Sequence, residues 1–214
     1  MLKKIFISGC SHVLGHGFED SLDGQNPSIH AWPAKILRDF NCEVINTSQS
    51  GESPIYCVEQ LQKYQHKELL SAIIVQFPDR MRYLHRKARE DFPYHHSFNQ
   101  SGDPFWDSII GKYYRLCHNW RTNDINLLAY AGYFECIAKK YNIPLWINSH
   151  DREDFSLLKD HGFVLDGRES WLKYCEVNNF DRLPDGHYGH EAHERWYYEY
   201  IKPWLQEKVF ASVA

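Results

Sequence analysis

Serine, histidine and aspartate stand in short polar segments of this 214-residue sequence, and together they could carry nucleophilic chemistry. Ser11 lies in the candidate turn Gly9–Val13. A serine hydroxyl needs an adjacent base, because its free pKa is too high for attack at neutral pH. His187 can supply that base, and Asp185 can orient the imidazole and stabilise its protonated form. These are the parts of a nucleophilic hydrolase, although the turn lacks the second glycine of the common Gly-x-Ser-x-Gly elbow.

Each of these residues also has a non-catalytic interpretation. Ser11 could cap a helix that follows a strand. His187 could be a solvated loop histidine, and Asp185 could serve the turn with Gly186, because Asp-Gly is a favoured turn pair. The residue types alone leave both interpretations open.

The segments that must position these residues alternate between strand and helix. Apolar runs predict four strands, at Lys3–Ser8, Glu43–Asn46, Leu70–Gln76 and Pro144–Asn148. Helical spacing of apolar residues predicts four helices, at Trp32–Phe40, Pro54–Tyr64, Thr122–Tyr141 and Glu191–Leu205. This alternation favours a parallel sheet covered on both faces, with ligands bound beyond the carboxyl ends of its strands. We expect one α/β domain over residues 1–214. We also expect an irregular or helical insertion at about 79–119, which could serve as a lid.

Three blocks of the sequence resemble the SGNH (GDSL-type) hydrolases. Ile5–Gly15 is similar to the first block, with a serine directly after the first strand, and its Gly-Cys-Ser-His variant resembles small proteins often found in phage genomes. Asn46–Gly51 is similar to the second block. Asp185–His193 is similar to the last block, in which the catalytic histidine lies six residues before a second histidine that opens the final helix.

The resemblance implies a flavodoxin-like three-layer α/β/α fold with a parallel central sheet, and a serine esterase or O-deacetylase. Its substrate would be a small or carbohydrate-linked ester. By the same resemblance, Ser11 is the nucleophile, His187 the general base and Asp185 its orienting acid. Gly51 and the Ser11 amide would line the oxyanion hole.

The sequence departs from the family pattern at two positions. Pro78 stands where the third block has an asparagine that donates to the oxyanion, and proline has no N–H to donate. Gln76 and Arg80 are candidate substitutes. Pro184 stands where the acid is usual, so Asp185 is displaced by one residue and must reach the histidine through a different turn.

The segment Arg80–Arg89 is rich in basic residues and has two interpretations. It could be a solvated helix face, or an anion clamp in which Arg80 binds the substrate, since arginine forks suit acidic groups. Four aromatic residues could stack on sugar rings, or could simply belong to the core: Trp106, Trp120, Trp171 and Tyr174.

Composition excludes several classes of protein. The net charge of -4 disfavours a generic nucleic-acid binder, which would carry a basic excess. No apolar run is long enough for a membrane helix or a signal-peptide core, so we expect a cytoplasmic location. The six cysteines form no Cys-x-x-Cys pair and are expected to be reduced thiols in or near the core.

Metals and cofactors are not expected. His187, His190 and His193 could suggest a metal site, but Gly186 and Gly189 indicate a loop rather than one helix face. The expected partner is therefore an ester substrate, without nucleic acid or membrane, and the oligomeric state stays open.

Two further functions remain open. The missing third-block asparagine is compatible with a non-catalytic SGNH-like binding or structural domain, since a fold does not guarantee a function. The same serine could also pass an acyl group to a sugar instead of water.

Overall fold

A four-stranded parallel sheet forms the centre of the molecule. The computed structural model describes residues 2–80, 83–86, 93–96, 120–163 and 168–211. The strand order is β2-β1-β3-β6, with β1 (Lys3–Ser8), β2 (Cys42–Asn46), β3 (Ala72–Phe77) and β6 (Leu145–Ser149). The four predicted strands are confirmed, with small shifts at their ends. Every residue of β3 is buried, as expected for a central parallel strand covered on both faces.

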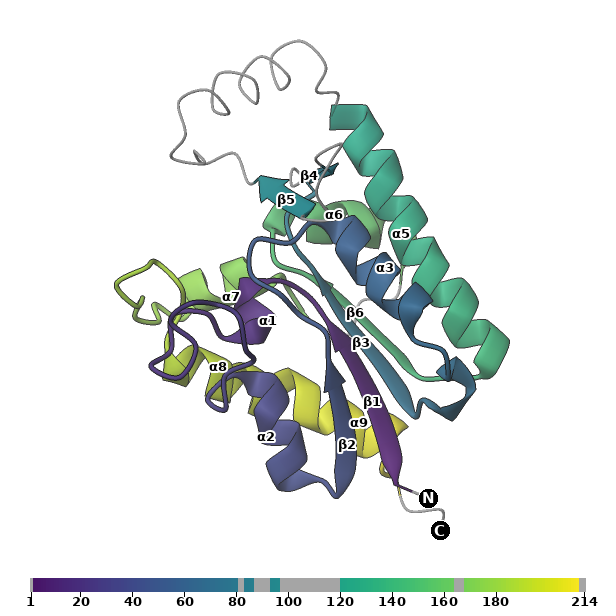
Figure 1. Ribbon diagram of the computed structural model, residues 1–214, viewed down its shortest axis with the longest axis horizontal. Coiled ribbons are helices and arrows are strands. Elements are labelled where there is room, and N and C mark those ends of the chain that lie inside the picture. The colour runs from purple at the N-terminus through teal and green to yellow at the C-terminus, as the bar shows by residue number, and fades with distance from the viewer. Residues whose placement is uncertain (1, 81–82, 87–92, 97–119, 164–167, 212–214) are drawn as a thin grey trace.

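Helices cover both faces of this sheet (Figure 1). Alternate strand residues point to opposite faces, so Ile5 and Ile7 pack in one core cluster and Phe6 in the other. The first face is covered by α1 (Ser11–Leu14), α2 (Trp32–Asp39), α7 (Trp171–Val177), α8 (His190–Trp196) and α9 (Lys202–Lys208). The second is covered by α3 (Pro54–Lys63), α5 (Trp120–Tyr141) and α6 (Arg152–Asp160). The predicted three-layer α/β/α class is confirmed.

The closing helix differs from the single helix expected at Glu191–Leu205. A π-helical segment, Tyr197–Ile201, separates α8 from α9. Pro203 provides a physical reason, because it cannot donate to the carbonyl of Glu199 four residues earlier. A wider turn at this point keeps the chain helical around the missing bond.

Part of the predicted insertion at 79–119 forms strands. β4 (Tyr83–Arg86) pairs antiparallel with β5 (Pro93–His96), whereas the sequence indicates irregular or helical structure there. Residues 81–82, 87–92 and 97–119 lie outside the described residues, and these include Trp106 and half of the basic segment Arg80–Arg89.

The remaining expectations on the core are mostly met. Four of the free cysteines are buried, namely Cys10, Cys42, Cys57 and Cys175, whereas Cys136 is exposed. Trp171 and Tyr174 are fully buried, which assigns both aromatics to the core. Across the described ranges, no helix is both long and apolar enough to cross a membrane.

Candidate active site

Ser11 begins α1 directly beyond the carboxyl end of β1. Gly9 is required in this turn, because a Cβ there would lie 2.4 Å from Val13 Cγ2 and 3.0 Å from the Gln76 carbonyl oxygen. The helix ends after one turn at Gly15, whose φ is +85°. Ser11 is only 3% exposed. Its N–H group belongs to the first turn of a helix, where the helix itself offers no acceptor.

Asp185 and His187 form a hydrogen-bonded pair in the turn before α8. Asp185 Oδ2 lies 2.9 Å from His187 Nδ1, and Asp185 Oδ1 accepts from the His187 backbone N–H at 3.0 Å. Gly186, with a φ of +88°, allows the tight turn between them. A backbone hydrogen bond closes the turn, because the Leu183 N–H donates to the His187 carbonyl at 2.7 Å. The displaced acid therefore reaches the histidine through this turn.

The surroundings of Asp185 keep its carboxyl group ionised. Burial raises the pKa of Asp185, but the backbone N–H and the ring of His187 outweigh it and lower the pKa below its usual range. The backbone of Gly17 packs against the carboxylate, since a Cβ at Gly17 would lie 2.3 Å from Asp185 Oδ2. An ionised Asp185 accepts a hydrogen bond from His187 Nδ1–H, which leaves Nε2 as the basic nitrogen of His187.

Three further imidazole rings gather around this pair, and we call His12, His16, His150 and His187 the histidine cluster. The His187 ring lies 4.7 Å from that of His12 and 5.0 Å from that of His16, between centroids. His12 also stacks on His150 at 4.2 Å. His16 Nδ1 lies 2.6 Å from Ser50 Oγ. The loops that follow β1, β2 and β6 therefore meet the segment before α8.

The predicted oxyanion-hole residues lie at the same edge of the sheet. Gln76 precedes the last residue of β3, is 0% exposed, and has no hydrogen-bond partner among the described residues at either side-chain amide atom. It shares a strand face with Ile74 and is paired in register with Asn148 of β6. Gly51, after β2, has a φ of +78°. Gln76 thus offers a buried donor beside the turn that carries Ser11.

Arg80 belongs to a different part of the structure. Its Nε lies 2.9 Å from Asp124 Oδ1, its Nη2 lies 3.2 Å from Glu153 Oε2, and its Nη1 contacts Asp154 Oδ1. The Arg80 backbone N–H also donates to Asp154 Oδ2 at 2.8 Å. The Asp154 side chain is buried in α6. The guanidinium therefore anchors the segment after β3 to α5 and α6.

The histidines considered as one metal site are separated. His193 is buried, and its Nδ1 accepts from the Trp32 N–H at 3.3 Å. His190 lies at the surface, 3.4 Å from Glu19. Within the described part of the chain, His187, His190 and His193 do not form one ligand group.

The sequence alone predicts no role for three members of the histidine cluster, His12, His16 and His150. His12 stands inside the Gly-Cys-Ser-His segment, and His150 directly follows β6, where a ligand-binding loop is expected in a parallel sheet. The high count of 13 histidines was the compositional signal. His16 carries no local signal, because its contact with Ser50 joins residues far apart in the chain.

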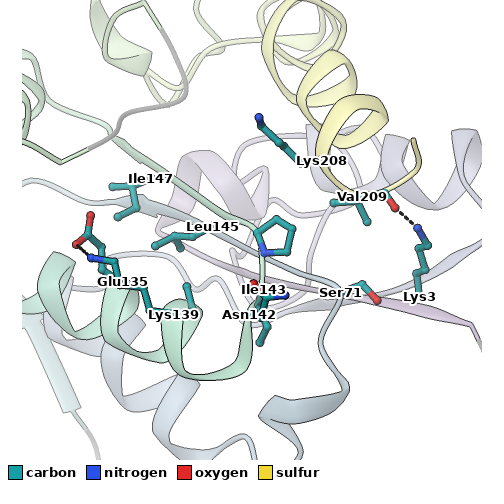
Figure 2. Close-up of a pocket in the computed structure, with 12 residues that line it drawn as sticks. Lys3, Ser71, Glu135, Lys139, Asn142, Ile143, Leu145, Ile147, Lys208 and Val209 are labelled. Carbon is teal, nitrogen blue, oxygen red and sulfur yellow. Dashed lines mark hydrogen bonds and ion pairs between the residues drawn. The ribbon is translucent and has the colours of Figure 1, made fainter. Parts of the chain in front are cut away.

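A cavity of about 680 Å³ lies at the opposite edge of the sheet. Figure 2 shows its lining, which includes Lys3, Ser71 and Leu145, at the beginnings of β1, β3 and β6. Lys3 Nζ donates to the Val209 carbonyl at its rim. Because ligands in parallel α/β sheets bind at the carboxyl ends of the strands, this cavity is separate from the candidate site.

Comparisons with known proteins identify the fold. No protein-family model matches the sequence, and no curated protein matches it. The fold is similar to that of TesA, with a TM-score of 0.56 and 13% identity over 96% of this chain and 99% of that one. The fold is also similar to that of a lipase/acylhydrolase from Enterococcus faecalis, with a TM-score of 0.55 and 11% identity over 100% of both chains. A carbohydrate esterase is similar with a TM-score of 0.53 and 10% identity, over 96% of this chain and 69% of that one. The chain thus has an SGNH-hydrolase fold, and at these identities the likeness extends to the fold alone.

Proposed function

We propose that this chain is a serine ester hydrolase of the SGNH type, acting through Ser11, His187 and Asp185. The observation that carries the proposal is the Asp185–His187 pair, whose His187 ring lies 4.7 Å from that of His12, the residue after Ser11. A strand end, a helix start and an oriented imidazole meet there, which is the arrangement a nucleophilic serine requires.

Acylation would begin when Ser11 Oγ attacks the ester carbonyl carbon. His187 Nε2 takes the hydroxyl proton, and Asp185 stabilises the imidazolium through its contact with Nδ1. The tetrahedral intermediate collapses when the imidazolium gives that proton to the leaving alcohol. Water then attacks the acyl carbon while His187 Nε2 takes its proton. The bond from that carbon to Ser11 Oγ breaks as the imidazolium returns the proton to the serine, and the carboxylic acid is released.

The negative oxygen of the intermediate needs fixed donors. The Ser11 and Gly51 N–H groups are two candidates, and Gln76 Nε2 is the third. Gln76 supports this role because its amide is buried without a hydrogen-bond partner in the described part of the chain, and such a group is costly unless a ligand satisfies it. Gln76 would then replace the donor that Pro78 cannot supply.

The substrate class that we propose is a small or carbohydrate-linked ester. One of the similar folds is a carbohydrate esterase and another a lipase/acylhydrolase. The shared fold is compatible with either kind of ester, and product analysis with acetylated sugars and short acyl esters separates them.

A fluorophosphonate reagent tests the activated serine. We expect stoichiometric labelling of the folded protein at Ser11, read by intact mass and peptide mapping, and none in Ser11→Ala. Ser48→Ala is the matched control, because Ser48 is also buried and follows β2 at the same edge. Labelling that persists in Ser11→Ala would contradict the proposed nucleophile.

A non-catalytic binding domain is the second candidate. The 3% exposure of Ser11 and the proline at position 78 favour it. The similar carbohydrate esterase is itself described as having divergent catalytic and non-catalytic binding functions. This alternative would be established by two results together. The protein would show neither labelling nor ester turnover, and calorimetry would show saturable binding of a glycan.

A further inference from the structure

Glu19, His30 and His190 form a group of metal-ligating side chains outside the catalytic residues. His30 Nε2 lies 3.1 Å from Glu19 Oε1, and His190 Nε2 lies 3.4 Å from Glu19 Oε2. One ligand atom from each of the three residues lies within 4.8 Å of the other two. We propose that these side chains bind a divalent transition-metal ion of the Zn²⁺ class.

The chemistry and spacing of the donors suit Zn²⁺. Two imidazole nitrogens and one carboxylate oxygen form a donor set that Zn²⁺ prefers, whereas Ca²⁺ and Mg²⁺ prefer oxygen donors alone. In a tetrahedral site with bonds of about 2.0–2.1 Å, neighbouring donor atoms lie about 3.3 Å apart. The 3.1 Å between His30 Nε2 and Glu19 Oε1 matches that spacing, and one ligand atom of each of the three residues lies within 4.8 Å of the others. Because Glu19 and His190 are exposed, water can complete the fourth position.

The loop that carries two of the ligands is held in place independently of them. Asp20, next to Glu19, accepts from Ser28 Oγ at 2.6 Å and from the Ile29 N–H at 2.7 Å. The His30 N–H donates to Ser28 Oγ at 3.0 Å. These bonds fix the backbone beside Glu19 and His30, so less conformational entropy is lost when an ion binds.

Aromatic packing orients the histidines. The Phe18 ring lies 4.5 Å from the His190 ring and 5.9 Å from the His30 ring, between centroids. His30 and His190 meet edge to face at 4.6 Å. The rings are therefore held by contacts other than those with the carboxylate.

The ion would join two segments that also hold the proposed base. His190 lies three residues after His187, and the loop of Glu19 carries His16, whose ring stacks on that of His187. Binding should therefore stabilise the folded protein, and we expect Zn²⁺ to raise the melting temperature.

Metal titration of the full chain tests this site. After removal of bound metal, Zn²⁺ is titrated in competition with a chromogenic chelator. We expect one ion per chain, and an affinity lowered at least about tenfold in Glu19→Gln and in His190→Ala. His66→Ala is the matched control, since His66 is an exposed histidine 3.5 Å from the carboxylate of Glu68. Its affinity should be unchanged.

Co²⁺ provides a second readout that excludes the thiols. We expect the visible spectrum of a tetrahedral site with nitrogen and oxygen donors, lost in His190→Ala. Absence of stoichiometric binding, binding unaffected by both ligand variants, or a thiolate charge-transfer band would each overturn the proposal. The Ser11→Ala protein should bind Zn²⁺ as the parent does, so this test is independent of the proposed esterase activity.

Discussion

Asp185 holds His187 at two points, through a 2.9 Å contact with ring Nδ1 and a 3.0 Å hydrogen bond from the backbone N–H. The two residues are separated only by Gly186, so a single turn sets both the ring orientation and its tautomer. The pKa of the carboxyl group is lowered by these contacts, although partial desolvation acts in the opposite direction. The acid and the base of the proposed triad are therefore placed by one local turn, and only the nucleophile comes from a distant part of the sequence.

Replacement of Asp185 by asparagine should leave the fold intact and reduce activity. The amide can donate to His187 Nδ1 and stabilise the wrong tautomer, which removes the basic Nε2. We expect a decrease in kcat of up to about 10⁴-fold for hydrolysis of a short acyl ester. Asp181→Asn is the control, because Asp181 is an exposed acid in the same segment. Unchanged kcat in Asp185→Asn would contradict the proposed role.

Gln76→Met separates catalysis from stability. Methionine has a similar length but no N–H donor, so kcat should fall by about 10²–10³-fold if Gln76 serves the oxyanion. The free energy of unfolding should stay equal or increase, because a buried amide without a partner is removed. Gln206→Met, at an exposed position of α9, should change neither quantity. Loss of stability with unchanged kcat would show a purely structural Gln76.

Acid should destabilise the protein through His193. Burial lowers the pKa of this histidine to about 3, from a model-peptide value of 6.5, with nearby Lys35 also contributing. Between those two values the unfolded chain binds a proton that the folded chain excludes, so stability is complete above about pH 6.5 and declines as the pH falls. The limiting slope for one such group is about 1.4 kcal/mol per pH unit.

Urea unfolding at about pH 7 and about pH 5 measures this dependence. His193→Gln keeps an acceptor for the Trp32 N–H but does not titrate in this range. The variant should therefore lose less stability on acidification than the parent. An equal pH dependence in both proteins would show that other groups cause it.

Arg80 should prove structural. Arg80→Met leaves the buried Asp154 carboxylate without its guanidinium, and we expect a loss of about 3–5 kcal/mol in the free energy of unfolding. The double variant Arg80→Met/Asp154→Leu should recover much of that loss, because neither charge then remains buried. If Arg80→Met instead keeps full stability and raises only KM, Arg80 is a substrate-binding residue.

The sequence determined the four strands of the central sheet and the longest helices, because strand and helix patterns depend on neighbours along the chain. The run Ala72–Val75 is apolar throughout, which indicates a strand covered on both faces, and β3 is buried along its whole length. The alternation of such runs with helical patterns was enough for the fold class. The contact between Asp185 and His187 was also within reach, because it is confined to one turn.

Only the tertiary structure decided which distant residues meet. The stacking of His12 on His150 joins the ends of β1 and β6, and no local pattern encodes that distance of 4.2 Å. The composition of the basic run that begins at Arg80 does not tell whether its side chains contact a ligand or the protein. In the structure, the Arg80 guanidinium contacts Asp154 of α6. Glu19 and His190 are likewise brought together by the packing of α8 against the loop after α1. The spacing of apolar residues in the sequence indicates which face of a helix or strand is buried. Which residue packs against that face depends on how the helices and the sheet assemble.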